Sequence, residues 1–199
     1  MKNFILIGAG GYIAPRHMQA IKETGNNLLA AMDVHDSVGI LDSYFPDAAF
    51  FTSIDQLGFF IDKQIESGTP VDYLTVCSPN HLHEEHILKK KKKGLDIQLV
   101  LYFCFLSTIM QLRLHPVIMA LKAKLLNSTN ENRCRVDVKY ITARGRWYHN
   151  SWKGDINKSG GIATNIGIHL FDLLLWLFGD VHESIVTSRS KEKITGQLK

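Results

Sequence analysis

Near its N-terminus the chain has a short apolar run followed at once by a glycine-rich turn. The run FILI occupies residues 4–7, and GAGG follows it at residues 8–11. A short continuous apolar run is typical of a parallel strand buried on both faces. Pro15 suits a first helical turn, and Gly25 suits a helix end. The sequence therefore predicts a strand, a tight turn and a helix, as in an α/β fold.

The glycine turn has the composition of a dinucleotide-binding fingerprint. Such a fingerprint needs a glycine for the turn, a second for close approach of a pyrophosphate, and a small residue where helix meets strand. One register uses Gly8 and Gly10 with Ile13 third, and the other uses Ala9 and Gly11 with Ala14 third. In either register, backbone amides at the helix start would face a phosphate. The predicted cofactor-binding residues of this turn are Gly8, Gly10, Gly11, Tyr12 and Ile13.

An acidic residue follows the second predicted strand. The segment NNLLAAM at residues 26–32 ends at Asp33, about 20 residues after the glycines. An acidic residue at this place hydrogen-bonds the ribose hydroxyls and repels a 2′-phosphate. Asp33 therefore predicts NAD rather than NADP as the cofactor. The alternative is that Asp33 only caps a turn.

A third predicted strand, Val71 to Cys77, leads into the turn Ser78, Pro79 and Asn80. Ligands of an open α/β sheet lie at the carboxyl ends of its strands, so this turn is predicted to line the cofactor crevice. The histidines that follow could bind zinc or could simply begin a helix with exposed side chains. Their spacing is not a standard ligand pattern, so we predict no metal site. These histidines are His81, His83 and His86.

Charge, cysteine content and hydrophobic run lengths argue against a nucleic-acid-binding, secreted or membrane-spanning protein. The net charge is +4, and the five lysines at 89–93, read as the solvated end of a helix, account for it. A nucleic-acid partner is therefore not expected. Three cysteines without a CxxC pair fit a reducing cytoplasm, and the N-terminal apolar run is too short for a signal peptide. The apolar stretch at 97–110 could be a membrane segment or a core strand. It is shorter than the roughly 20 residues of a span, so no membrane segment is predicted.

Several of these motifs together resemble the Gfo/Idh/MocA oxidoreductase family. They are the glycine turn followed by Arg16 and His17, and Ser-Pro-Asn-x-x-His ending at His83. The resemblance adds His83 to Ser78, Pro79 and Asn80 as a predicted cofactor-binding residue. Residues 144–179 look like the subgroup of UDP-N-acetyl-glucosaminuronate 3-dehydrogenases. The resemblance implies an α/β fold, with a Rossmann-type parallel-sheet domain at 1–110 and an incomplete α+β domain at 111–199. It also implies NAD as cofactor, a UDP-sugar oxidised at its 3-hydroxyl, 2-oxoglutarate as a re-oxidant, and a homo-oligomer.

The family's nicotinamide site is flanked by the lysine of a Glu-Lys-Pro motif and the histidine of a Gly-x-His-x-x-Asp motif. Gly167, His169 and Asp172 match the second motif, on a helix predicted from Asn165 to Phe178. His169 and Asp172 are three residues apart and so share one helix face, as a base and its orienter would. The alternative is a histidine that merely packs on a leucine-rich helix.

A loop rich in cations and aromatic rings precedes this helix, at residues 144–158. Cations and flat rings suit a diphosphate, a carboxylate and a sugar face. The same mixture could bind single-stranded nucleic acid or form a structural aromatic cluster. No basic stripe accompanies it elsewhere, which favours a sugar nucleotide. The predicted substrate-binding residues are Arg144, Tyr148, Trp152, Lys153 and Asn165.

One family motif is missing from the chain. After the strand GLDI at 94–97 the family continues into Glu-Lys-Pro and a crossover helix, but only QLVLYFCFL at 98–106 precedes the next predicted strand, near 107–116. Parallel neighbours need a crossover of about a dozen or more residues. The two strands are therefore expected to fuse, leave the sheet or pair otherwise. With further strands predicted only at 135–142 and 184–188, we interpret the chain as a damaged or incompletely decoded copy with weak turnover.

Overall fold

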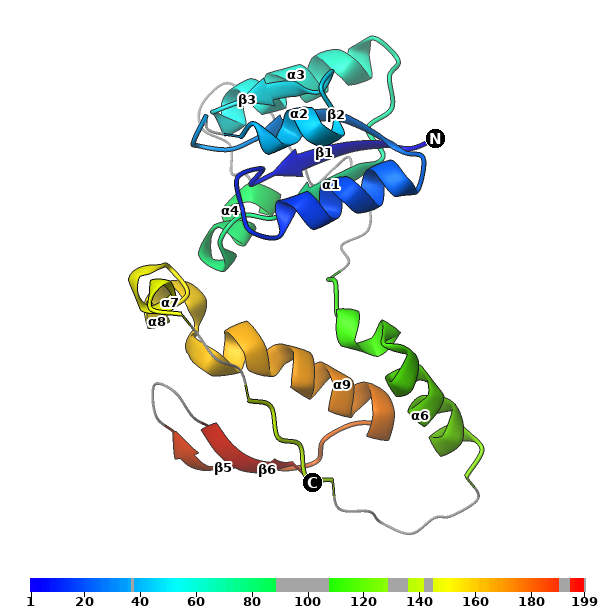
Figure 1. Cartoon of the computed structure of the whole chain (residues 1–199), viewed down its shortest axis with the longest axis vertical. Coiled ribbons are helices and arrows are strands. Elements are labelled where there is room, and N and C mark those ends of the chain that lie inside the picture. The colour runs from blue at the N-terminus through cyan, green and yellow to red at the C-terminus, as the bar shows by residue number, and fades with distance from the viewer. Residues whose placement is uncertain (37, 89–107, 129–135, 142–144, 190–193, 199) are drawn as a thin grey trace. The chain divides into compact units, whose positions relative to one another are not determined.

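The computed structural model describes residues 1–36, 38–88, 108–128, 136–141, 145–189 and 194–198 (Figure 1). The chain divides into two compact units, Met1–Leu106 and Ser107–Lys199. The predictions for residues 89–107, including the two joined strands, lie outside the described residues.

The first unit is built on a four-stranded parallel sheet with the strand order β3-β2-β1-β4. The predicted strands at 4–7, 26–32 and 71–77 are confirmed, with bounds that shift by at most two residues. The edge strand β3 was not predicted, because it is only three residues long. The strands are β1 (Asn3–Ile7), β2 (Asn27–Met32), β3 (Ala49–Phe51) and β4 (Tyr73–Val76).

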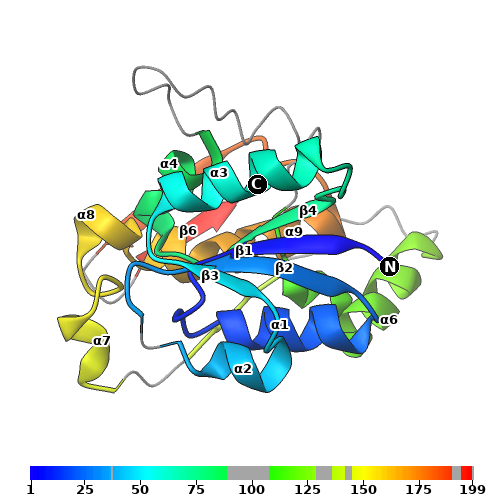
Figure 2. The same cartoon turned by 90° about the horizontal axis from the view of Figure 1, so that it is seen from above.

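Helices cover both faces of this sheet, α1 and α2 on one face and α3 on the other (Figure 2). Leu6 of β1 faces α1, whereas its neighbours Ile5 and Ile7 face α3, and all three are fully buried. Burying each such side chain contributes about 1.5–3 kcal/mol. The apolar run at 4–7 is continuous because both of its faces are core. The helices are α1 (Ala14–Glu23), α2 (Ile40–Tyr44), α3 (Ile54–Glu66), η1 (Asn80–Leu82) and α4 (His83–Leu88).

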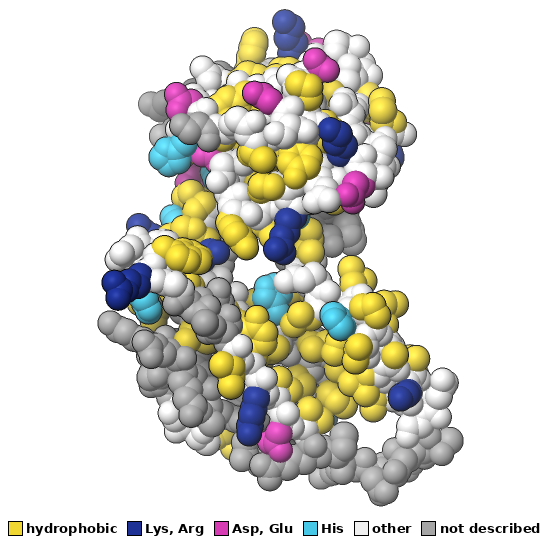
Figure 3. All heavy atoms as spheres, viewed as in Figure 1, with side chains coloured by type: hydrophobic (Ala, Val, Ile, Leu, Met, Phe, Trp, Pro, Cys, Tyr) yellow, Lys and Arg dark blue, Asp and Glu magenta, His cyan; other side chains and the backbone are white. Residues whose placement is uncertain are grey.

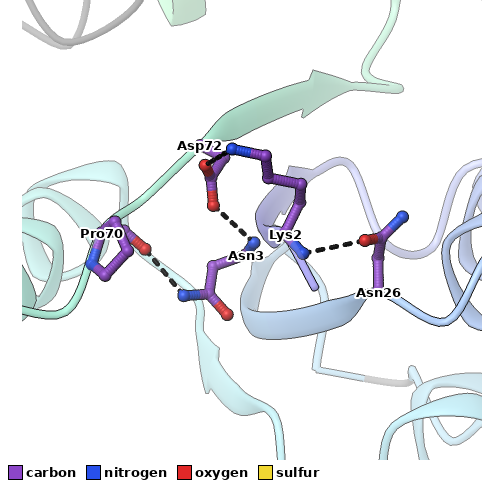
Figure 4. A network of polar contacts seen from close by, with 5 residues as sticks. All are labelled: Lys2, Asn3, Asn26, Pro70 and Asp72. Carbon is purple, nitrogen blue, oxygen red and sulfur yellow. Dashed lines mark hydrogen bonds and ion pairs between the residues drawn. The ribbon is translucent and has the colours of Figure 1, made fainter.

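A polar network holds the beginning of β1 against the segment before β4 (Figure 4). The Asp72 carboxylate accepts hydrogen bonds from the Lys2 ammonium at 2.7 Å and from the Asn3 amide at 2.8 Å. The Asn3 side chain donates to the Pro70 carbonyl, and the Lys2 amide donates to Asn26. The Asn3 amide and then Lys2 hold the pKa of Asp72 below its usual range. These contacts align β1 with β4 at the end opposite the glycine turn.

The second unit contains short helices, one longer helix and a hairpin. Its elements are η2 (Gln111–Leu114), α6 (Pro116–Leu126), α7 (Trp147–Asn150), α8 (Ile156–Ser159), the π-helical turn η3 (Ala163–Gly167), α9 (Ile168–Phe178), β5 (Ser184–Arg189) and β6 (Ile194–Leu198). The predicted helix at 165–178 is confirmed as η3 followed by α9, and the predicted strand at 184–188 is confirmed as β5. β5 pairs with β6 in an antiparallel two-stranded sheet.

Two predicted strands of this unit are wrong. The segment predicted as a strand near 107–116 contains the 3-10 helix η2, and residues 136–141 form no strand. Apolar residues favour a strand only where a partner strand satisfies the backbone hydrogen bonds. Among the described residues, no strand pairs with either segment. The strand β6 was missed, because its sequence ITGQL contains a glycine and little apolar alternation.

Large apolar side chains remain exposed in the second unit. Figure 3 shows hydrophobic side chains gathered where α6 and α9 lie. Those more than a third exposed include Val117, Met119, Leu121, Leu126, Ile168, Phe171, Leu175 and Phe178. The helical stretch Ile156–Phe178 is long and apolar enough to cross a membrane by length and composition alone. One such helix is weak evidence of a span, because a core helix passes the same test.

Candidate functional site

The glycine turn after β1 is packed tightly against the residue that follows β4. Gly8 has a φ of +87°, and a Cβ atom placed on it would lie 2.5 Å from the backbone nitrogen of Ser78. A Cβ atom on Gly11 would lie 2.8 Å from the carbonyl oxygen of Cys77. Both positions therefore require glycine, one for its backbone conformation and both for space. The carboxyl ends of β1 and β4 meet at this turn, as the sequence predicted.

Burial distinguishes the two registers of the fingerprint. Ala14, the third residue of the second register, is fully buried in the core beside α1. Ile13, the third residue of the first, is 38% exposed, and Tyr12 is 79% exposed. A small residue is needed where the helix packs on the sheet, and Ala14 occupies that place. The geometry favours the register of Gly11 and Ala14.

Asp33 lies beside the glycine turn and is not only a local cap. One carboxylate oxygen accepts a hydrogen bond from the Gly10 amide at 2.8 Å. The other accepts from the His35 amide at 3.0 Å, which closes a short turn after β2. Asp33 thus joins the carboxyl end of β2 to the exposed part of the glycine turn. A 2′-phosphate on the adenosine ribose would meet this negative charge, and free hydroxyls would find an acceptor.

The turn after β4 brings Ser78, Pro79 and Asn80 to the same edge of the sheet. The Ser78 hydroxyl lies 2.8 Å from His86 Nδ1, and His83 Nε2 lies 2.7 Å from the Ser78 carbonyl oxygen. Both histidines therefore bind the turn. Among the described residues, no group of three metal-ligating side chains occurs. His86 was missed as a site residue because sequence spacing does not show which buried atom it contacts.

Cys77, the last residue before this turn, is buried and unreactive. Burial raises the pKa of its thiol to about 12. A thiolate is the nucleophilic form of cysteine, so this side chain does not provide a nucleophile at neutral pH.

In the second unit, one ring nitrogen of His169 is buried. Its Nδ1 atom has no hydrogen-bond partner among the described residues. A buried polar atom left unpaired is unfavourable by about 1–3 kcal/mol. Such atoms are rare in native proteins and often mark functional positions. The residue follows Gly167, which ends the π-helical turn η3, at the second position of α9.

Asp172 does not orient His169 in this structure. Its carboxylate accepts hydrogen bonds from Arg113 Nε, at 2.8 Å, and from a terminal guanidinium nitrogen of the same residue. This two-bond pair joins η2 to α9 and raises the pKa of Arg113. The predicted pairing of base and orienter is therefore wrong for these residues. The three-residue spacing does place them on one face, but a cation from another element engages the acid.

Two cations lie near the single tryptophan of α9. The Arg113 guanidinium carbon is 6.0 Å from the Trp176 ring centroid, and the Lys122 ammonium is 5.4 Å from it. Lys122 also donates to the Trp176 carbonyl at 2.5 Å. A cation suits the carbonyl end of a helix and the face of an indole ring. Arg113 and Lys122 were not predicted, because contacts more than 50 residues apart leave no local pattern.

In the predicted substrate-binding loop, two tryptophan rings lie near the ammonium group of one lysine. Lys153 Nζ lies 5.5 Å from the Trp147 ring centroid and 5.7 Å from that of Trp152. Tyr148 is buried and meets the edge of the Trp147 ring. Asn165 lies within η3, close in sequence to His169. Arg144 lies outside the described residues.

Comparison with known proteins identifies the family. The family model for the Gfo/Idh/MocA oxidoreductase family, NAD-binding Rossmann fold, matches residues 2–99. The model for the same family's C-terminal alpha/beta domain matches residues 132–199. The chain belongs to the Gfo/Idh/MocA oxidoreductase family. Its first unit carries the family's NAD-binding Rossmann fold, so the predicted cofactor, NAD, is confirmed.

Solved structures place this family member near one subgroup. The WlbA (WbpB) dehydrogenase from Thermus thermophilus, in complex with NAD and UDP-GlcNAcA, is 40% identical with a TM-score of 0.83. The same enzyme in complex with NAD and alpha-ketoglutarate is 39% identical with a TM-score of 0.81. Each alignment covers 100% of this chain and 70% of that chain. The WlbA dehydrogenase from Bordetella pertussis, at 20% identity and a TM-score of 0.75 over 100% of this chain and 65% of that one, shows the shared fold.

The residues of the first unit fit NAD. The two close-packed glycines leave no side chain between the turn and β4, and Gly10 is exposed. The carboxylate of Asp33 is held at this turn by two backbone amides. The turn would hold the pyrophosphate and Asp33 the adenosine ribose.

Proposed function

We propose that this protein is an NAD-dependent oxidoreductase of a sugar nucleotide of the UDP-N-acetyl-glucosaminuronate type, acting at the 3-hydroxyl. The supporting observation is the 39–40% identity to WlbA dehydrogenases over the whole chain, together with the Gly10–Asp33 contact in the cofactor turn. NAD would supply a hydride acceptor. The sugar's hydroxyl proton must then pass to a base of the protein.

His169 is the proposed base. Its Nδ1 is buried without a hydrogen-bond partner among the described residues, and such atoms often mark functional positions. Asp172 is bound by Arg113, so its carboxylate does not take part in the proposed proton transfer. The proposed substrate contacts come from the aromatic loop, where Lys153 lies near two indole rings. A cation beside flat rings suits a uridine diphosphate or a uronate carboxylate. Arg144, Tyr148 and Asn165 complete the proposed set, and 2-oxoglutarate is the proposed re-oxidant.

A second candidate function rests on the missing Glu-Lys-Pro motif. No such tripeptide occurs in the sequence. Removal of a catalytic acid or base typically lowers a rate by about 10²- to 10⁴-fold. The protein would then bind NAD and a sugar nucleotide with little or no turnover.

Two measurements on the purified full chain separate these candidates. Binding of NAD and of UDP-N-acetyl-glucosaminuronate is measured by calorimetry, and NADH fluorescence is then followed after the sugar nucleotide is added, with and without 2-oxoglutarate. Slow turnover that His169→Asn abolishes and His182→Asn, an exposed control, leaves intact supports the dehydrogenase. NAD binding without any NADH supports the binding protein. Turnover unaffected by His169→Asn contradicts the role of His169, and absence of sugar-nucleotide binding contradicts both candidates.

A further inference from the structure

A buried hydrogen bond joins Ser78, in the turn after β4, to His86 of α4. The Ser78 hydroxyl oxygen lies 2.8 Å from His86 Nδ1, and each residue is 8% exposed. His83, at the beginning of the same helix, holds the Ser78 carbonyl oxygen at 2.7 Å. Two histidines of α4 therefore hold Ser78. His86 contacts its side chain, and His83 contacts its backbone carbonyl.

The chemistry of these two contacts limits the positions of the hydrogens. A carbonyl oxygen only accepts, so His83 Nε2 carries a hydrogen and donates it. Burial lowers the pKa of His86, against a smaller opposite effect of Glu85, so its ring is neutral at neutral pH. A neutral ring satisfies the Ser78 hydroxyl in either tautomer: Nδ1 accepts from the hydroxyl when the hydrogen is on Nε2, and donates to it when the hydrogen is on Nδ1. The pair is thus satisfied without burying a charge.

The other side of Ser78 packs on the glycine turn. A Cβ atom on Gly8 would lie 2.5 Å from the Ser78 nitrogen and 2.9 Å from its Cα atom. The Cys77 amide also donates to the Ile7 carbonyl at 2.7 Å, directly before Gly8. The Ser78 backbone is therefore held between the glycine turn and α4. In such close packing, a shift of Ser78 by a few tenths of an ångström must move the glycine turn as well.

We propose that His86, acting through Ser78, is a positioning residue for NAD: it fixes the turn after β4 against the glycine turn and so sets cofactor affinity. His83 holds the same turn through its carbonyl. The proposal concerns cofactor binding alone, so it does not depend on the sugar substrate or on turnover. Loss of one neutral hydrogen bond that orders the site is expected to weaken NAD binding about tenfold.

The test is calorimetric titration of NAD into the full chain and its variants. His86→Ala and Ser78→Ala should each weaken NAD binding about tenfold, and the double variant should be no weaker than either single one. His86→Asn should recover most of the affinity, because its short side chain places an amide where Nδ1 stood. His86→Gln, whose amide reaches the Nε2 position, should not. Glu84→Gln, an exposed change in the same helix, is the control for helix effects.

Three results would overturn the proposal. They are an unchanged NAD affinity in His86→Ala despite a lower free energy of unfolding, additive losses in the double variant, and equal losses for His86→Asn and His86→Gln. The first result would mean a purely structural role, since calorimetry reports the affinity of the folded molecules. Far-UV circular dichroism of each variant before titration establishes the folded fraction, so a variant that fails to fold is replaced by the Ser78→Ala comparison.

Discussion

The carboxylate of Asp172 in α9 accepts two hydrogen bonds from the guanidinium of Arg113 in η2, 59 residues earlier in the chain. A two-bond arginine–carboxylate pair fixes orientation as well as distance. It joins η2 to α9 within the second unit.

Arg113→Gln should lower the thermal midpoint of the second unit more than Arg113→Lys does. Glutamine removes the charge, whereas lysine keeps it but offers no planar two-bond geometry. All three tryptophans lie in the second unit, so their emission reports its unfolding selectively. Lys124→Gln, an exposed change in α6, is the control. Equal midpoints for Arg113→Gln and Lys124→Gln would show that the pair does not stabilise the unit.

Gly8→Ala should destabilise the Rossmann unit by more than about 2 kcal/mol. A left-handed backbone costs a non-glycine residue about 1–2 kcal/mol, and the new Cβ atom would also overlap Ser78. Gly25→Ala, at a φ of +69° with open space, should show only the backbone part. Gly39→Ala, at a φ of −52° with open space, should change the free energy of unfolding by less than about 0.5 kcal/mol. Urea unfolding, monitored by amide hydrogen exchange of the strands, measures the free energy of unfolding of all three variants. An unchanged free energy of unfolding in Gly8→Ala would contradict the close packing of Gly8.

Asp33→Asn should weaken NAD binding by about 10- to 100-fold and reduce the preference for NAD over NADP. The change removes a charged acceptor for the ribose hydroxyls, and a hydrogen bond to a charged group contributes about 1.5–3 kcal/mol. It also removes the charge that would repel the 2′-phosphate of NADP. Asparagine keeps one oxygen for the Gly10 or His35 amide, so the turn should remain folded. Calorimetry with both cofactors checks the result, with the exposed Asp36→Asn as control. An undiminished preference for NAD would assign cofactor selection to another residue.

The Rossmann unit should lose stability as the pH falls below about 6.5. Burial lowers the pKa of His17, and burial is also the main cause of the lowered pKa of His86. The unfolded chain then binds more protons than the folded chain below the ordinary histidine pKa, so stability falls until the folded pKa is passed and levels off below it. His17→Gln should flatten this slope, and His35→Gln, at an exposed position, should not. Urea unfolding across this range measures the slope, and a slope that His17→Gln leaves unchanged would contradict the assignment.

The first unit could be predicted in outline because its signals are local. The run at 4–7, the glycines and Asp33 lie in order along a strand, turn, helix and strand, and the parallel sheet brings their ends to one edge. Predictions for the second unit were less accurate. Residues 136–141 have strand-like composition but no partner strand among the described residues, whereas ITGQL pairs with β5. Pairing requires a neighbour in space, and a single segment does not specify that neighbour.

The order of strand, glycine turn, helix and acidic residue could be read from the sequence alone, as could the place of His169 on its helix. Folding was needed to show that Arg113 binds the carboxylate of Asp172, that His169 Nδ1 has no partner among the described residues, and that His86 contacts Ser78. Backbone conformation and burial pattern repeat along a few residues, but the partner of a polar side chain depends on which distant element folds against it.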